Sequence, residues 1–439
     1  MAEMLSLMQE EAVRFCAELI RIDSTNTGDP ASTGDGETRC AELIRDWLSE
    51  LPSEWFERVP GRGNLVVSIP GKDPQLPRLA IHAHTDVVPA DPVKWSVDPF
   101  AGEIRDGRVW GRGAVDMKDM IGMLVAAVRQ TLREGHRPRR GIVLLFVADE
   151  EVEGANGMGF LVDEHPEVFR GVNEAIGEVG GFSVPTPTGD AYTIGIAEKG
   201  IAWATLRATG TEGHGSMVPN LEGAPARLVA ALQRISEHEW PEEVDATASA
   251  VLTGLGSVLG VHVDPRDESG FAQALAPLGP VAGMFSNAFR TTAAITQVHA
   301  GSKTNTVPGE AIATVDCRIA PGRDEEFRRV FAELVGPGIE VTWETGQSVV
   351  APYDTALVAS MRAAVQAVQP DAQFLPFLTG GATDAKSLDR LGIACYGFVP
   401  LRLPPGFDFP GAFHGIDESV PVDALRTGSL ILREFLLSQ

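Results

Sequence analysis

The chain has 439 residues, which is too long for one simple core and predicts two or three domains. Its composition, with 44% hydrophobic and 22% charged residues, is that of an ordinary globular protein. The net charge of −24 makes nucleic acid and anionic membrane surfaces poor partners.

The cysteines and the first residues bear on the compartment. None of the 4 cysteines belongs to a Cys-x-x-Cys pair, which favours a reducing compartment over a disulfide framework. Residues 1–20 predict an amphipathic helix with acidic side chains, unlike a signal peptide. No run of about 18 apolar residues predicts a transmembrane helix. We therefore expect a cytoplasmic protein.

Strand and helix patterns alternate over the first 190 residues. Apolar strands are predicted at 79–82, 141–148 and 175–176, and a Gly-x-Gly sequence leads into a predicted helix at 115–134. This alternation predicts an α/β fold with a mostly parallel sheet between helices. Sites in such sheets form beyond the carboxyl ends of the strands, so the residues that follow each strand are the candidates.

A different pattern begins near residue 191 and predicts a smaller α+β unit. It contains, in order, a strand at 196–209, a helix at 224–238, strands at 294–299 and 311–319, a helix at 324–334 and a strand at 339–343. The stretch from residue 240 to 293 shows no regular pattern. Because the alternation resumes after residue 347, we predict one α/β domain in two pieces, 1–190 and 348–439, interrupted by residues 191–347.

A His-x-Asp sequence, His84-Thr85-Asp86, follows the first strand. Two residues that are two apart on an extended segment face the same way. That placement suits a metal ligand, His84, and a neighbour, Asp86, that orients it. The alternative is a buried histidine bonded to a turn aspartate. His82, on the same face, is interpreted as structural.

Further carboxylates follow the other predicted elements. Asp116 precedes the helix after the Gly-x-Gly, where it is either a metal ligand or a helix cap. Glu150 and Glu151 end the most apolar strand, and a cation would relieve their mutual repulsion. One of the pair can bind metal while the other acts as a general base; the alternative is a solvated acidic loop. Glu178 ends the next strand between glycines.

Two late histidines complete the candidates. His414, in FHGIDES, could supply one more ligand, and His214, in GTEGHGSM, lies between glycines that expose it. Either could also be a solvated loop residue. The chain contains no Gly-x-Ser-x-Gly, no His-Glu-x-x-His and no Walker lysine, so serine-hydrolase, zincin and nucleotide-binding motifs are absent.

Seven motifs occur in a distinctive order: IHAHTDVVP, WSVDPF, GRGAVDMK, ADEEVEG, GEVGG, GHGSM and FHGIDES. In this order the chain, from about residue 19 onward, resembles a co-catalytic dizinc metallopeptidase family. It is the family of aminoacylase, carboxypeptidase G, carboxypeptidase S, acetylornithine deacetylase and succinyl-diaminopimelate desuccinylase. The resemblance implies a zinc-aminopeptidase-like α/β catalytic domain. Residues 191–347, which interrupt it, would form a lid and dimerisation domain. Residues 240–286 have no match in this pattern.

The resemblance implies five ligands for two zinc ions, which cobalt or manganese could replace. Asp116 would lie between the two ions. His84 and Glu178 would complete the ligands of one ion, and Glu151 and His414 those of the other.

The resemblance also implies the catalytic roles. Glu150 would be the general base that deprotonates the attacking water and then protonates the leaving amine. Asp86 would orient His84. His214 would stabilise the oxyanion, in many members from the partner subunit of a dimer.

Five further residues resemble positions that hold the substrate carboxylate. They are Asn305, Arg318, Gly380, Gly381 and Thr383, the last three in the glycine-rich sequence TGGATDAK.

The implied function is metal-dependent hydrolysis of an amide bond in a small peptide or an N-acyl amino acid with a free carboxylate. The nearest alternative is an N-deacylase of the acetylornithine deacetylase type. An alternative from another class is a metal-binding protein without catalysis. The expected partners are a small-molecule substrate and a second copy of the chain, paired through the lid domain.

Overall fold

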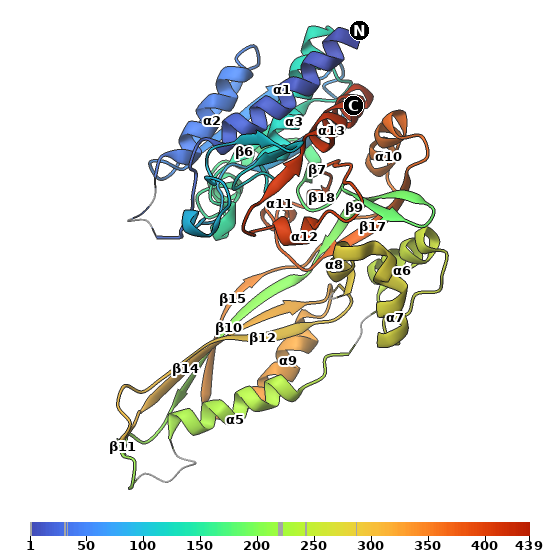
Figure 1. The fold of residues 1–439 in the computed structure, drawn as a ribbon. Coiled ribbons are helices and arrows are strands. Elements are labelled where there is room, and N and C mark those ends of the chain that lie inside the picture. The colour runs from blue at the N-terminus through green and yellow to red at the C-terminus, as the bar shows by residue number, and fades with distance from the viewer. Residues whose placement is uncertain (1, 30–31, 33, 218–222, 242–243, 287) are drawn as a thin grey trace.

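The computed structural model describes residues 2–29, 32, 34–217, 223–241, 244–286 and 288–439. A large sheet and a smaller sheet form two bodies that the chain joins by several crossings (Figure 1). The amino and carboxyl termini lie near each other on the large body. This arrangement confirms the predicted α/β fold with an inserted α+β unit.

The large sheet has ten strands. The central order is β1-β2-β6-β3-β7-β18-β9-β16, and β17 and β8 also pair with β9. Their bounds are β1 (Ser53–Glu57), β2 (Gly63–Ile69), β3 (Arg78–His84), β6 (Ile142–Val147), β7 (Val172–Gly177), β8 (Ser183–Thr186), β9 (Gly189–Glu198), β16 (Val349–Val350), β17 (Gln373–Thr379) and β18 (Ala394–Gly397). The neighbours β6, β3, β7 and β18 are mutually parallel, so their carboxyl ends meet at one edge.

Helices cover both faces of the large sheet. On one face lie α1 (Ala2–Ile20), α2 (Gly36–Trp47), α3 (Lys118–Arg133) and α13 (Val422–Ser438), and α10 (Ala356–Val368) packs on α13. On the other face lie α4 (Met158–Glu164) and α11 (Ala385–Asp389). Because both faces are covered, every side chain of β6 is buried, as expected for a parallel strand inside a sheet.

The lid sheet is antiparallel, with the order β12-β14-β10-β15. Its strands are β10 (Gly200–Thr209), β12 (Thr292–Ala300), β14 (Glu310–Ile319) and β15 (Ile339–Gly346). One face packs on α5 (Ala224–Glu237) and α9 (Asp324–Val335), so alternate side chains of β10 are buried. A short ribbon at the far end pairs β11 (Gly213–His214) with β13 (Thr306–Val307).

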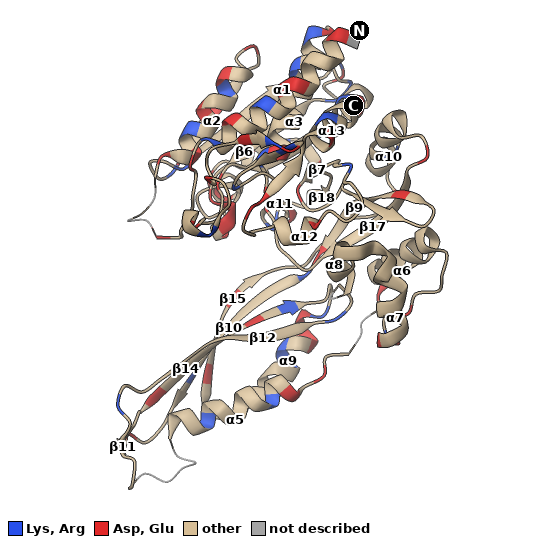
Figure 2. Ribbon diagram, in the orientation of Figure 1, with Lys and Arg blue, Asp and Glu red and all other residues tan. Residues whose placement is uncertain are grey.

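Smaller elements complete the chain. They are β4 (Glu103–Arg105), β5 (Arg108–Trp110) and β19 (Ser419–Pro421), which form a three-stranded sheet, and α12 (Phe409–Ala412). In the described ranges, charged residues lie mainly on helices and loops, and the central strands are almost free of them (Figure 2). No helix among the described residues is long and apolar enough to cross a membrane.

Two predictions of secondary structure are wrong. The strand predicted at 196–209 is two strands, since the chain leaves β9 at Glu198 and enters β10 of the other sheet at Gly200. The stretch 240–293, predicted irregular, contains three helices, α6 (Ala246–Leu259), α7 (Glu268–Leu275) and α8 (Ala282–Ser286). Small residues and glycines in α6 hide its helical period.

The division into domains 1–190, 191–347 and 348–439 stays a proposal. Strand pairing places β9 in the large sheet, and α6 packs on β17 of that sheet although it lies between residues 191 and 347. The lid body is therefore built from β10 to α5 and from β12 to β15.

Candidate metal centre

The predicted ligands lie where neighbouring elements end. His84 is the last residue of β3, Glu151 follows β6, and Glu178 follows β7. Asp116 stands just before α3, and His414 comes after α12. Parallel strands end at one edge of the sheet, so the first three side chains converge there, and the two loops bring the others to them.

The five side chains form two groups of three that share Asp116. In one group, His84 Nε2 lies 3.0 Å from Asp116 Oδ1 and 3.8 Å from Glu178 Oε2. In the other, His414 Nε2 lies 3.3 Å from Asp116 Oδ2 and 3.1 Å from Glu151 Oε2. The donor atoms of each group all lie within 4.8 Å of one another. Each oxygen of Asp116 thus faces a different imidazole.

The electrostatics of the two groups fit bound cations. Burial raises the pKa of Glu178 to about 7, and burial also raises the pKa of Glu151. Hydrogen bonds to Asp116 and Glu151 raise the pKa of His414 to about 10. Oε1 of Glu151 is buried without a hydrogen-bond partner among the described residues. Buried carboxylates together with imidazoles are a donor set that suits zinc, cobalt or manganese.

Glu150 lies beside these groups in the 3-10 turn η3 (Glu150–Val152). Burial and then the charge of Glu178 raise its pKa well above the ordinary value. A raised carboxyl pKa suits a group that must both take up and release a proton near neutral pH. Glu150 follows Asp149, whose φ of 68° is left-handed.

Left-handed backbone recurs around the centre. Among the described non-glycine residues, Val179 has φ 58° next to the predicted ligand Glu178, and the predicted ligand His414 has φ 56°. Such conformations cost about 1–3 kcal/mol each and are retained where the surrounding structure requires them.

Asp86 does more than the sequence predicts. His84 Nδ1 donates to the backbone carbonyl oxygen of Asp86 at 3.1 Å, which leaves Nε2 to face the ligand group. The Asp86 carboxylate accepts the backbone N–H groups of Glu150 and Glu151, each at 3.1 Å. Asp86 therefore fixes the positions of the His84 imidazole and of the backbone of Glu150 and Glu151 relative to one another.

A buried network behind Asp86 was missed by sequence reasoning. Asn26 Nδ2 donates to Asp86 Oδ2 and to Asp149 Oδ1, both at 3.0 Å. Asn26 Oδ1 accepts from Arg62 Nη2 at 2.8 Å, and Arg62 forms a short ion pair with Glu37. Glu37 Oε1 in turn accepts the backbone N–H of Asp149 at 2.7 Å. All five side chains are buried, so the network fixes the turn that carries Glu150.

Glu418 is a second positioning residue that the sequence did not reveal. Its carboxylate accepts the backbone N–H groups of Val115 and Asp116 at 2.7 and 3.3 Å and pairs with Arg112 at 2.6 Å. Arg112 also donates to the backbone carbonyl oxygen of His414 at 3.2 Å. The only sequence signal for this role is that Glu418 lies within the FHGIDES motif, four residues after His414.

Three predicted residues lie in the lid, apart from the ligand groups. His214 is exposed on β11 at the far end of the lid (Figure 1), and the backbone of Asn305 bonds to Gly215 beside it. Arg318 lies at the opposite end of β14, where it pairs with Asp316 at 2.8 and 3.1 Å. Within one chain, His214 and Asn305 do not meet the metal ligands.

The predicted glycine-rich loop, residues 379–386, joins β17 to α11 in the large body. Thr383 is buried, and its hydroxyl and N–H both donate to Glu198. A Cβ added at Gly380 would have no neighbour within 4 Å, so there is open space beside it, and one added at Gly381 would lie 3.5 Å from Thr379 Oγ1, an ordinary contact.

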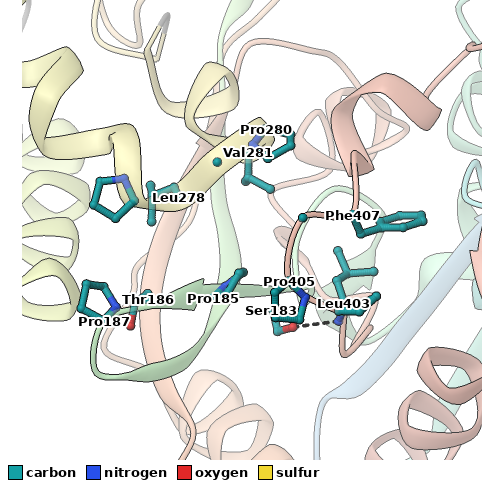
Figure 3. Close-up of a pocket in the computed structure, with 14 residues that line it drawn as sticks. Ser183, Pro185, Thr186, Pro187, Leu278, Pro280, Val281, Leu403, Pro405 and Phe407 are labelled. Carbon is teal, nitrogen blue, oxygen red and sulfur yellow. Dashed lines mark hydrogen bonds between the residues drawn. The ribbon is translucent and has the colours of Figure 1, made fainter.

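A cavity of about 380 Å³ lies elsewhere, between β8, the 3-10 segment η5 (Ala276–Val281) and residues 403–407 (Figure 3). Its walls are mainly proline and apolar side chains, and Ser183 Oγ accepts the N–H of Leu403 at 2.9 Å. None of the predicted site residues lines this cavity.

Known proteins resemble the chain along most of its length. The human N-fatty-acyl-amino acid synthase/hydrolase PM20D1 is 30% identical over 386 residues, which cover 82% of this chain and 74% of that protein. Mouse aminoacylase-1 is 30% identical over 367 residues, which cover 81% of this chain and 79% of that protein.

Solved structures share the fold. A metallo-carboxypeptidase of the M20 family from Sulfolobus solfataricus superposes with a TM-score of 0.73 at 18% identity, covering 97% of this chain and 98% of that chain. Human carnosine dipeptidase 1 gives 0.70 at 16% identity, covering 99% and 97%. A dinuclear metal binding peptidase of the M20 family from Bacillus subtilis gives 0.60 at 16% identity, covering 98% of both chains.

The model of the peptidase family M20/M25/M40 matches residues 80–438, a range that contains all five predicted metal ligands. The resemblance noted from the sequence motifs is thereby confirmed. The chain is a member of the peptidase family M20/M25/M40, a family of metal-dependent hydrolases of amide bonds.

Proposed function

We propose that this chain hydrolyses the amide bond of a small peptide or an N-acyl amino acid with a free carboxylate. The observation that carries the proposal is the pair of ligand groups joined by Asp116, with the carboxylate of Glu150 next to them and bound to neither. The names of the relatives, an aminoacylase and an N-fatty-acyl-amino acid hydrolase among them, support this substrate class.

We propose zinc as the metal, because the mixed imidazole and carboxylate donors suit it, with cobalt or manganese as substitutes. His84 and Glu178 would hold one ion, Glu151 and His414 the other, and Asp116 both. Bound dications would act as Lewis acids on the amide carbonyl.

The chain itself would move the protons. The Glu150 carboxylate takes a proton from the attacking water and delivers it to the nitrogen of the leaving amine. The Asp86 carboxylate accepts the backbone N–H of Glu150 and so holds that residue in place. The Glu150 carboxylate then serves both transfers from one position.

We propose that the substrate carboxylate lies between the loop of Gly380, Gly381 and Thr383 and the lid residue Arg318. Arg318 carries a guanidinium suited to a carboxylate, and Asp316 holds it on β14. The choice between a dipeptidase or carboxypeptidase activity and an acetylornithine-type deacylase depends on the lid loops.

We further propose a homodimer through the lid, in which His214 and Asn305 complete the site of the partner subunit. Both lie at the far end of the lid within one chain, and β12 is an exposed edge strand on which a second copy could pair. The four buried free cysteines fit the proposed cytoplasmic location.

The test is a screen of dipeptides and N-acyl amino acids against zinc-, cobalt- and manganese-loaded protein, with Glu150→Gln as the matched variant. Glu150→Gln should bind metal as the wild type does and lose at least about 100-fold in kcat. Full activity of that variant would refute the mechanism. If the wild type binds metal and hydrolyses nothing, the alternative of a non-catalytic metal-binding protein holds instead.

A further inference from the structure

Two adjacent strands carry the chain between the large sheet and the lid. Pairing of β10 with β15 ends at Ile201 and Gly346, and pairing of β9 with β16 begins at Glu198 and Val349. Lys199, Gln347 and Ser348 between these pairs lie outside both ladders, and Gly200 pairs only with Ile319 of β14. The crossing is therefore a two-stranded ribbon with a gap in its pairing, which is the place where the ribbon can bend.

Lys386 spans this gap. Its Nζ donates to the backbone carbonyl oxygens of Lys199 at 2.7 Å and Gln347 at 2.8 Å, one on each strand of the ribbon. Only 13% of its side chain is exposed. Gly346 makes room for it, since a Cβ there would lie 3.0 Å from Lys386 Cδ. Backbone carbonyls that leave a ladder inside a protein need another donor, and Lys386 supplies it to both strands.

The proposed substrate loop is fastened to the same ribbon at three points. Thr383 donates to Glu198 through its hydroxyl at 2.5 Å and its N–H at 3.2 Å. Lys386 lies 3.5 Å from Glu198 Oε2. At the start of the loop, the carbonyl oxygen of Thr379 accepts the N–H of Lys199 at 3.1 Å. Glu198 and Thr379 are paired in the large sheet, so the contacts to Glu198 keep the loop on that sheet. Bending of the ribbon moves the carbonyl oxygens of Lys199 and Gln347, to which the loop is bonded through Lys386.

We propose that Lys386 is a positioning residue that couples the orientation of the lid to the position of the substrate loop. The inference rests on the proposed function in one respect, that Gly380, Gly381 and Thr383 hold the substrate carboxylate. When the lid turns about the ribbon, Lys386 follows the carbonyl oxygens of Lys199 and Gln347, and it displaces the end of the loop that carries Gly380 and Gly381. A substrate that closes the lid thus also shifts the loop that binds its carboxylate.

The test compares Lys386→Met with the wild type in two measurements. Spin labels at Glu42→Cys on α2 and Arg329→Cys on α9 report the distance between the two bodies, in labelled protein diluted with unlabelled protein. The native cysteines are buried, and both label sites are exposed, so labelling is selective. The second measurement is KM and kcat on the best substrate of the screen. Lys72→Met, an exposed lysine remote from the ribbon, is the control.

Lys386→Met should broaden the distance distribution and raise KM about 10-fold, with kcat changed less than about 3-fold and metal content unchanged. Lys386→Arg should recover part of both effects. A change in only one of the two measurements, or in neither, would overturn the coupling.

Gly346→Ala provides an independent route if Lys386→Met does not fold. It leaves the charge of Lys386 in place and displaces its side chain, so it should produce the same paired change. Wild-type distances and KM in that variant would refute the proposal. The distance measurement needs no substrate, so it tests the hinge role even if the proposed function fails.

Discussion

Replacement of Asn26 should reduce both stability and turnover, because its amide holds two buried carboxylates. Asn26→Ala removes two hydrogen bonds of 3.0 Å, to Asp86 and Asp149, and one of 2.8 Å from Arg62. Hydrogen bonds to charged groups contribute about 1.5–3 kcal/mol each. A water that enters the space left by the side chain would replace part of that, so we expect the free energy of unfolding to fall by about 2–4 kcal/mol.

The effect on turnover follows from the same contacts. Asp86 and Asp149 set the turn that carries Glu150, and a displacement of about 1 Å in a catalytic group can cost roughly 100-fold in rate. We expect Asn26→Ala to lower kcat by about 10- to 100-fold, with KM within about 3-fold of the wild type. Urea unfolding and steady-state kinetics at saturating zinc measure the two quantities.

Asn26→Asp separates positioning from packing. It keeps the shape of the side chain and replaces the donating amide with a third carboxylate, so it should impair kcat more than Asn26→Ala does. The exposed Asn173 on β7 supplies the control Asn173→Ala, which should match the wild type. Wild-type kcat in Asn26→Asp at every pH from 6 to 9 would refute the positioning argument.

Three further predictions concern the metal centre. Glu418→Ala should weaken the affinity for the zinc proposed at Glu151 and His414 about 10- to 100-fold, measured by chelator competition, because it frees the loops of Asp116 and His414. Unchanged affinity would contradict that role. The pKa of Glu178 is about 7 and that of His414 about 10, both above the ordinary values. At pH 7 these two groups of the metal-free chain therefore hold protons that a cation must displace. Zinc affinity should therefore fall as pH is lowered from 9 to 6, and calorimetry in buffers of different ionisation enthalpy should show proton release. If each site uses His214 of the partner subunit, mixing inactive His214→Ala and Glu150→Ala chains should restore about a quarter of wild-type activity. Half of the dimers then contain both variants, and each of these regains one of its two sites. No recovery after proven subunit exchange would count against a shared site.

The clustering of the proposed metal ligands could be predicted from the sequence because three of them follow a rule of topology. His84, Glu151 and Glu178 each end a strand in an α/β alternation, and parallel strands bring such residues to one edge. The motif order then supplied Asp116 and His414. What brought them together was the fold, so no spacing in the sequence could give the distances between them.

The supporting residues could not be predicted in this way. Asn26, Arg62 and Glu37 are single polar residues in unremarkable local sequence, and their partners lie 25 to 123 positions away. Such contacts leave no periodic pattern. The strand break at Lys199 was missed for a related reason, because strand-forming residues stand on both sides of it although the chain changes sheets there.

The residues of the two ligand groups span stretches of the sequence that differ in length. His84, Asp116 and Glu178 all lie within residues 84–178, whereas the other group also needs His414. During synthesis, a ribosome has to add more than 200 residues after the first group is complete before the second can exist. A chain that stops before residue 414 therefore has the side chains of one group but not of the other. Hydrolysis that needs both proposed metal positions would have to wait until the last segment has packed against the first.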